Sequence, residues 1–110
     1  MLDFKCQIGE YEGFPVLILV GALFKDEAVP FKISLEECLS GNPQKLYLDL
    51  SQLHSIDSSG LGVVIYHNSM LRNNKQELVI LNPSSEMMEL LEISNLNKIM
   101  AIEQVPRSWI

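Results

Sequence analysis

The sequence lacks any apolar stretch long enough to cross a membrane as a helix. Its longest apolar run extends from Val16 to Phe24 and has nine residues, whereas a membrane-spanning helix needs about 20. The N-terminus, MLDFKCQIGE, also lacks the basic region, apolar stretch and small-residue cleavage site of a secretory signal. We therefore expect no direct membrane insertion and a cytoplasmic location.

Basic side chains are scarce as well. The chain has 8 Lys and Arg residues against 14 Asp and Glu residues, which gives a formal net charge of −6 at pH 7. Nucleic-acid binding depends on lysines and arginines that neutralise phosphates, so this composition argues against DNA or RNA as a partner. The partners should be proteins, preferably with a basic or mixed surface that attracts an acidic domain.

Cysteine and histidine are too few and too scattered for a metal site. Cys6 and Cys38 lie far apart with no CxxC spacing, and no histidine is placed to complete a ligand set. We expect both thiols to stay reduced and at least partly buried. His54 and His67 should have surface or packing roles, so the sequence predicts neither a metal nor a cofactor.

Motifs of nucleotide binding and serine catalysis are also missing. The chain has neither GxGxxG nor GxxxxGK[ST], so any nucleotide contact would come through a partner. No glycine stands two residues before Ser58 or Ser59, as the nucleophile elbow G-x-S-x-G requires. A nucleophilic serine would also need a histidine oriented by a carboxylate. We therefore expect a binding protein and not an enzyme.

The 110 residues, of which 47% are apolar and 20% charged, suit one domain with one core. Strand and helix patterns alternate, which favours an α/β fold with a largely parallel sheet. We expect strands over 3–8, 14–20, 45–50, 77–81 and 99–102. We expect three helices: one over 26–39, one that begins at 58, and one that follows the turn and cap at 82–85 and ends at 93. In this scheme Gly21 ends the second strand, and a loop over 51–56 follows the third.

The third predicted strand is the most regular. Its leucines Leu46, Leu48 and Leu50 alternate with Lys45, Tyr47 and Asp49, as expected of a half-buried strand. Tyr47 and Asp49 should therefore lie on its less buried face. Downstream, apolar side chains recur at helical spacing from Leu61 to Leu71, with Asn68 as the polar interruption.

Between this strand and helix, Asp57, Ser58 or Ser59 should occupy the helix cap or first turn. A helix start offers unpaired N–H groups and a partial positive charge, which suit a phosphate or another anion. A second interpretation is structural, because Asp and Ser are favoured N-caps and Gly60 and Gly62 can permit close packing. On the serines alone, both interpretations remain open.

Two segments resemble the STAS domain family, which takes its name from sulfate transporters and bacterial anti-sigma factor antagonists. The segment 46–62, LYLDLSQLHSIDSSGLG, is similar to the family signature, and its DSSGLG core is close to the antagonist branch. The segment 90–99 is similar to the closing helix and the turn into the last strand, with Asn95 where glycine is usual. Asparagine tolerates a left-handed turn, so the exchange is mild. The resemblance covers about residues 14–103, and 104–110 form a tail.

The resemblance implies a single STAS domain over 1–110. Its sheet would be mostly parallel, with four to five strands, an antiparallel edge strand, consecutive strands side by side and helices mainly on one face. The implied function is an anti-sigma factor antagonist that docks an anti-sigma factor with serine protein kinase activity. Phosphorylation of Ser58, with Ser59 as second candidate, would end docking, and a PP2C-type phosphatase would act as a further partner. We expect a monomer or weak dimer.

One departure from the family leaves an alternative open. Antagonists usually carry Gly-Glu-Leu-Asp after the second strand, and its acids help to engage the kinase, but here Ala22 and Phe24 replace them. Asp26 and Glu27 follow nearby but are shifted along the chain. The alternative is a STAS scaffold subunit of a transporter or signalling complex, without a phosphorylation switch. The predicted partner-binding residues are Lys25, Asp26, Asp57, Ser58, Ser59, Gly60 and Leu61. The role of the tail, including Trp109, stays open.

Overall fold

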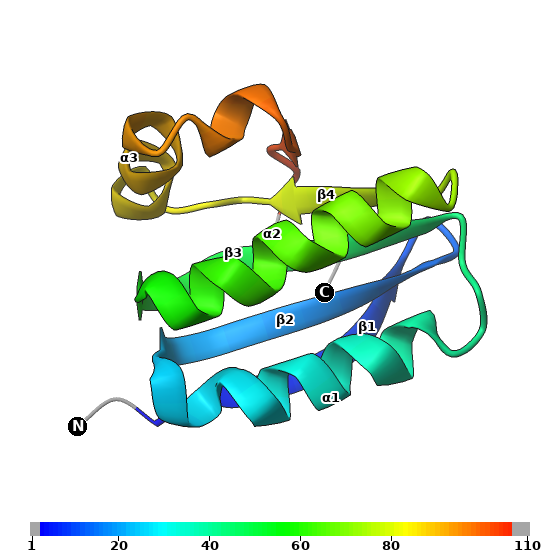
Figure 1. The fold of residues 1–110 in the computed structure, drawn as a ribbon, viewed down its shortest axis with the longest axis horizontal. Helices are drawn as coiled ribbons and strands as arrows, with labels where there is room; N and C mark the ends of the chain where they lie inside the picture. The colour runs from blue at the N-terminus through cyan, green and yellow to red at the C-terminus, as the bar shows by residue number, and fades with distance from the viewer. Residues whose placement is uncertain (1–2, 107–110) are drawn as a thin grey trace.

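Five strands form one mixed sheet in the computed structural model, which describes residues 3–106 (Figure 1). The elements are β1 (Lys5–Tyr11), β2 (Phe14–Leu23), the short 3-10 helix η1 (Lys25–Glu27), α1 (Ala28–Leu39), β3 (Lys45–Ile56), α2 (Ser58–Asn73), β4 (Glu77–Leu81), α3 (Ser85–Ile93), the 3-10 helix η2 (Leu96–Lys98) and β5 (Ala101–Glu103).

The strands lie in the order β1-β2-β3-β4-β5, so each strand neighbours the next one in the sequence. β1 pairs antiparallel with β2, and the other three pairs are parallel. A tight turn at Glu12 and Gly13, with φ angles of 52° and 85°, makes the hairpin possible. Helical crossovers connect the parallel strands, as such pairs require. The predicted α/β topology with an antiparallel edge strand is confirmed.

The main core lies between the sheet and the helices. Figure 1 shows α1 and α2 side by side across one face of the sheet, with α3 beyond the end of β4. Inward side chains of all three helices join those of the strands in one buried cluster, among them Phe31, Leu35, Val64, Leu71 and Leu91. The smaller cluster on the opposite face contains strand residues and Val105 but no helix residue. The helices therefore cover one face, as predicted.

The prediction that Tyr47 and Asp49 lie on a less buried face is wrong. Tyr47 is 2% exposed and Asp49 is 0% exposed. The ring of Tyr47 meets those of Tyr11 and Phe14, with ring centres 5.2 and 6.4 Å apart, and Asp49 Oδ1 accepts a hydrogen bond of 2.9 Å from the Ser51 N–H. Side chains from β1 and β2 thus cover β3 on the face opposite the helices, and a parallel strand buried on both sides results.

The two central strands are longer than predicted. Gly21 does not end β2, and the expected loop over 51–56 belongs to β3, because the strands stay paired until Leu23 meets Ile56. Gly21 has a φ of 100°, and a Cβ there would lie 1.9 Å from the Asp3 carbonyl oxygen. Glycine is therefore needed inside this strand because the N-terminal segment passes so close.

The remaining boundaries shift by small amounts. β1 extends to Tyr11, and β5 begins at Ala101 because Ile99 still closes the η2 turn. Asn95 has the predicted left-handed conformation, with a φ of 59°.

No helix within 3–106 has the length and apolar character to span a bilayer. Of the tail, Val105 donates its N–H to Asn82 Oδ1 at 2.7 Å, while Trp109 lies outside the described residues.

Candidate functional site

The predicted switch region is the junction of β3 and α2. β3 ends at Ile56 and α2 begins at Ser58, so Asp57 is the only residue between them. Asp57 has extended backbone angles, and its Oδ1 accepts a hydrogen bond of 3.1 Å from the Gly60 N–H. It is therefore the N-cap of α2. Ser58 follows as the first helical residue, and its side chain is exposed at the positive end of the helix dipole.

The second oxygen of the Asp57 carboxylate holds another part of the chain. Oδ2 accepts a hydrogen bond of 3.0 Å from the Lys25 N–H, and the Asp57 N–H donates to the Leu23 carbonyl oxygen at 3.2 Å. One residue thus links the end of β2, the η1 turn and the start of α2. Lys25 and Asp26, both exposed, are held next to the Ser58 end of the helix.

Gly60 belongs to the packing beneath this site. It is buried, and a Cβ there would lie 2.7 Å from Ile56 Cγ1 and 2.8 Å from Leu23 Cγ. The helix therefore approaches the ends of β2 and β3 so closely that only glycine fits. Its inclusion among the partner-binding residues needs correction, because a buried glycine offers no surface to a partner. Ser59 and Leu61 are half-buried, which leaves Ser58, Lys25 and Asp26 as the exposed members of the predicted set.

The two positions where family antagonists carry acids have different environments. Ala22 is buried, whereas the Phe24 ring is 44% exposed. A hollow of about 400 Å³ lies beside them and is lined by Asp3, Phe4, Ala22, Phe24, Asp26, Glu27 and Ser55. Carboxylates therefore still line this edge of the sheet, although the sequence supplies them from other positions. The exposure of Phe24 and the contribution of Asp3 were not predicted, because both depend on how separate segments of the chain pack together.

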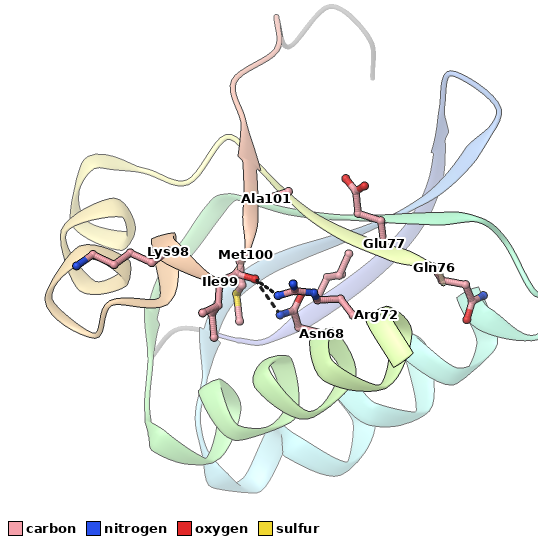
Figure 2. Close-up of a pocket in the computed structure, with 9 residues that line it drawn as sticks. Asn68, Arg72, Gln76, Glu77, Lys98, Ile99, Met100 and Ala101 are labelled. Atoms are coloured by element: carbon pink, nitrogen blue, oxygen red, sulfur yellow. Dashed lines mark hydrogen bonds between the residues drawn. The ribbon is translucent and has the colours of Figure 1, made fainter. Parts of the chain in front are cut away.

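A second hollow, of about 490 Å³, lies near the other end of α2 (Figure 2). Asn68 Nδ2 and Arg72 Nη1 point into it and both donate to the Ile99 carbonyl oxygen, at 3.3 and 3.2 Å (Figure 2). Asn68, the polar interruption of the predicted helix stripe, therefore fastens α2 to the turn before β5. Sequence reasoning missed this role because the acceptor is a distant backbone oxygen.

The two thiols and the His67 imidazole are packing groups. Cys38 is buried and Cys6 is partly buried; both are free thiols, and burial raises the pKa of each, that of Cys38 to about 11. His67 is buried with Nδ1 2.8 Å from the Val63 carbonyl oxygen, whereas His54 is exposed. Within residues 3–106 no group of His, Cys, Asp or Glu side chains is arranged to hold a metal ion.

Replacing Asp57 by alanine should destabilise the fold by about 1 to 3 kcal/mol, because both carboxylate oxygens accept backbone hydrogen bonds. Urea denaturation would measure the change in the free energy of unfolding. Asp57→Asn keeps an oxygen that can cap the helix and should cost less. If Asp57→Ala unfolded at the wild-type urea concentration, the carboxylate would not hold the β2, η1 and α2 segments together.

The sequence of this chain is similar to that of a known protein family. The STAS domain family model matches residues 5–108. The anti-sigma-B factor antagonist of Listeria monocytogenes is 37% identical over 60 residues, which make up 54% of this chain and 53% of that protein, so the match spans about half its length. The anti-sigma F factor antagonist of Paenibacillus polymyxa is 24% identical over 102 residues, 92% of this chain and 87% of that protein.

Solved structures agree on the fold. The Bacillus cell fate determinant SpoIIAA in its phosphorylated form has a TM-score of 0.71 at 20% identity and covers 96% of this chain and 94% of its own. The unphosphorylated form of SpoIIAA, an anti-sigma factor antagonist, has a TM-score of 0.70 at 19% identity, with 96% and 92% covered. Since the family model matches nearly the whole chain, this protein belongs to the STAS domain family.

Proposed function

We propose that this protein is an anti-sigma factor antagonist that docks an anti-sigma factor through the surface around Ser58. The observation that carries the proposal is the exposed Ser58 hydroxyl at the first position of α2, fixed by the Asp57 cap. The names of the Listeria and Paenibacillus relatives support the assignment. In this function the protein catalyses nothing itself: it occupies the anti-sigma factor, which then releases its sigma factor.

Phosphorylation of Ser58 by the anti-sigma factor, acting as a serine kinase, ends the docking. A phosphate adds about 1.5 to 2 negative charges, which a helix start stabilises by roughly 0.3 to 1 kcal/mol, so the fold tolerates it. A partner packed closely on Ser58 must instead desolvate the phosphate, which can cost several kcal/mol. Since about 1.4 kcal/mol is a tenfold change in affinity, the interface responds much more strongly than the fold. A PP2C-type phosphatase restores docking.

SpoIIAA supplies a precedent for the tolerance of the fold. Its unphosphorylated and phosphorylated forms resemble this chain equally well, with TM-scores of 0.70 and 0.71. Both forms therefore share the fold of this chain. A switch that acts on the interface alone is consistent with this behaviour.

Incubating the purified protein with the anti-sigma kinases of its source organism and ATP should transfer one phosphate to Ser58. Intact-protein mass spectrometry would count the phosphates and fragment spectra would locate them. Ser58→Ala should abolish the transfer, whereas Ser59→Ala should retain it. A phosphate that persists in Ser58→Ala would refute the assignment of Ser58.

The loss of acids at Ala22 and Phe24 favours one second candidate, a STAS scaffold subunit without a phosphorylation switch. In that function Ser58 and Ser59 would be ordinary contact residues, and no kinase of the organism would modify them. Co-purification of the tagged protein with a transporter ATPase, together with unchanged binding by Ser58→Glu, would support the scaffold and exclude the antagonist.

A further inference from the structure

Gly62 is a helix glycine that the fold itself does not require. It is the fifth residue of α2, and an added Cβ would meet no atom within 4 Å. Its φ is not in the left-handed region, in contrast to that of Gly21, and no neighbour crowds it, in contrast to Gly60. Alanine at an interior helix position is more stable than glycine. The glycine therefore calls for an explanation outside the packing of this domain.

Gly62, which has no side chain, lines an exposed groove between α1 and α2. The groove has a volume of about 330 Å³ and is lined by Lys32, Ser59, Gly62, Val63, Tyr66 and His67. His67 is fixed by its contact with the Val63 carbonyl oxygen, and the Tyr66 ring meets it edge-on with ring centres 5.2 Å apart. Tyr66 is nevertheless 61% exposed. The groove therefore presents a fixed, largely apolar surface to solvent.

The groove adjoins the proposed docking surface. Ser59, which lines it, directly follows Ser58 in the first turn of α2. Lys32, an exposed residue, is its single formally charged lining residue. A partner that covers Ser58 would reach this groove and meet an apolar wall with the positive charge of Lys32 at its rim.

We propose that the anti-sigma factor seats one aliphatic or aromatic side chain against the backbone of Gly62, with a carboxylate of the same partner facing Lys32. This inference rests on the proposed function. Interface anchors of this kind fill small pockets and contribute most of the binding energy. The volume of about 330 Å³ is close to the lower limit for small-molecule sites, so a partner side chain has room to enter. Apolar contact at this groove adds recognition that does not depend on the acids lost at Ala22 and Phe24.

The test compares Gly62→Ala with Gly41→Ala in binding to the purified anti-sigma factor that the wild-type protein binds. Gly41 is a matched control, because an added Cβ there also meets no atom within 4 Å and its φ is not left-handed. We expect Gly62→Ala to weaken binding at least tenfold and Gly41→Ala to leave it unchanged. Gly62→Ala should also melt a few degrees higher than wild type, since it adds helix propensity. Lys32→Glu should weaken binding as well.

Each outcome separates this inference from the proposed function. If Gly62→Ala binds like wild type while Ser58→Glu does not, the groove is no anchor site and the antagonist function stands. If neither variant alters binding, the proposed function fails as well. Light scattering of the isolated protein tests a second copy as the occupant. A dimer that Gly62→Ala dissociates would assign the groove to self-association and overturn the inference.

Discussion

Ser58→Glu should bind the anti-sigma factor at least roughly 30-fold more weakly than wild type, because about 2 kcal/mol of desolvation and repulsion falls on a closely packed contact. Its melting temperature should stay close to that of wild type. Ser58 is exposed at the start of α2, and negative charge is favourable there. Isothermal titration calorimetry and thermal unfolding of the same samples would measure both effects.

Two variants control for charge and for the loss of the hydroxyl. Ser69→Glu adds the same charge at another exposed serine of α2 and should bind like wild type. Ser58→Ala should bind nearly as tightly as wild type and resist inactivation by ATP. Equal weakening by Ser69→Glu and Ser58→Glu would mean that the effect is one of net charge, and a specific Ser58 contact would be excluded.

Gly60→Ala should destabilise the fold by about 1 to 3 kcal/mol. The added methyl group would lie within 2.8 Å of carbon atoms in Ile56 and Leu23, and within 3.0 Å of the Leu23 carbonyl oxygen. Overpacking of this kind forces side chains and backbone to move, which outweighs the gain in helix propensity. The change in the free energy of unfolding can be measured by urea denaturation.

Gly62→Ala is the matched control for this measurement, since it makes the same change two residues further along the same helix. Its methyl group meets open space, so the variant should be as stable as wild type or more stable. Opposite signs for the two variants would demonstrate that contact with the strands decides the outcome. If Gly60→Ala were as stable as Gly62→Ala, the close approach of α2 to β2 and β3 would be incorrect.

Local patterns in the sequence were sufficient for most strands and helices, whereas the order of the strands was implied by the resemblance to the STAS family. The apolar run after Phe14, the alternation at 45–50 and the strand at 77–81 each predict a strand, and β4 has the predicted boundaries. The cap chemistry at Asp57 and the left-handed turn at Asn95 were also predictable. In each case the decisive interactions involve residues close together in the sequence.

What was not predictable depends on contacts between distant segments. Tyr47 and Asp49 alternate with leucines as if they faced solvent, but both are buried, and rings from β1 and β2, those of Tyr11 and Phe14, meet that of Tyr47. The polar segment 51–56 reads as a loop, yet pairing with β2 keeps it in the sheet. Similarly, nothing in the DSSGLG motif tells that Gly60 is crowded while Gly62 meets open space.

The single-residue connection between β3 and α2 has a mechanical consequence. Asp57 is the whole linker and also accepts the hydrogen bond that caps the helix. No flexible connection is therefore left about which α2 could rotate relative to β3. At its far end, Asn68 and Arg72 tether the same helix to the Ile99 carbonyl oxygen. A negative charge added to Ser58, the first residue of α2, therefore cannot be moved away by a rotation of the helix. The molecule that contacts Ser58 must accommodate that charge.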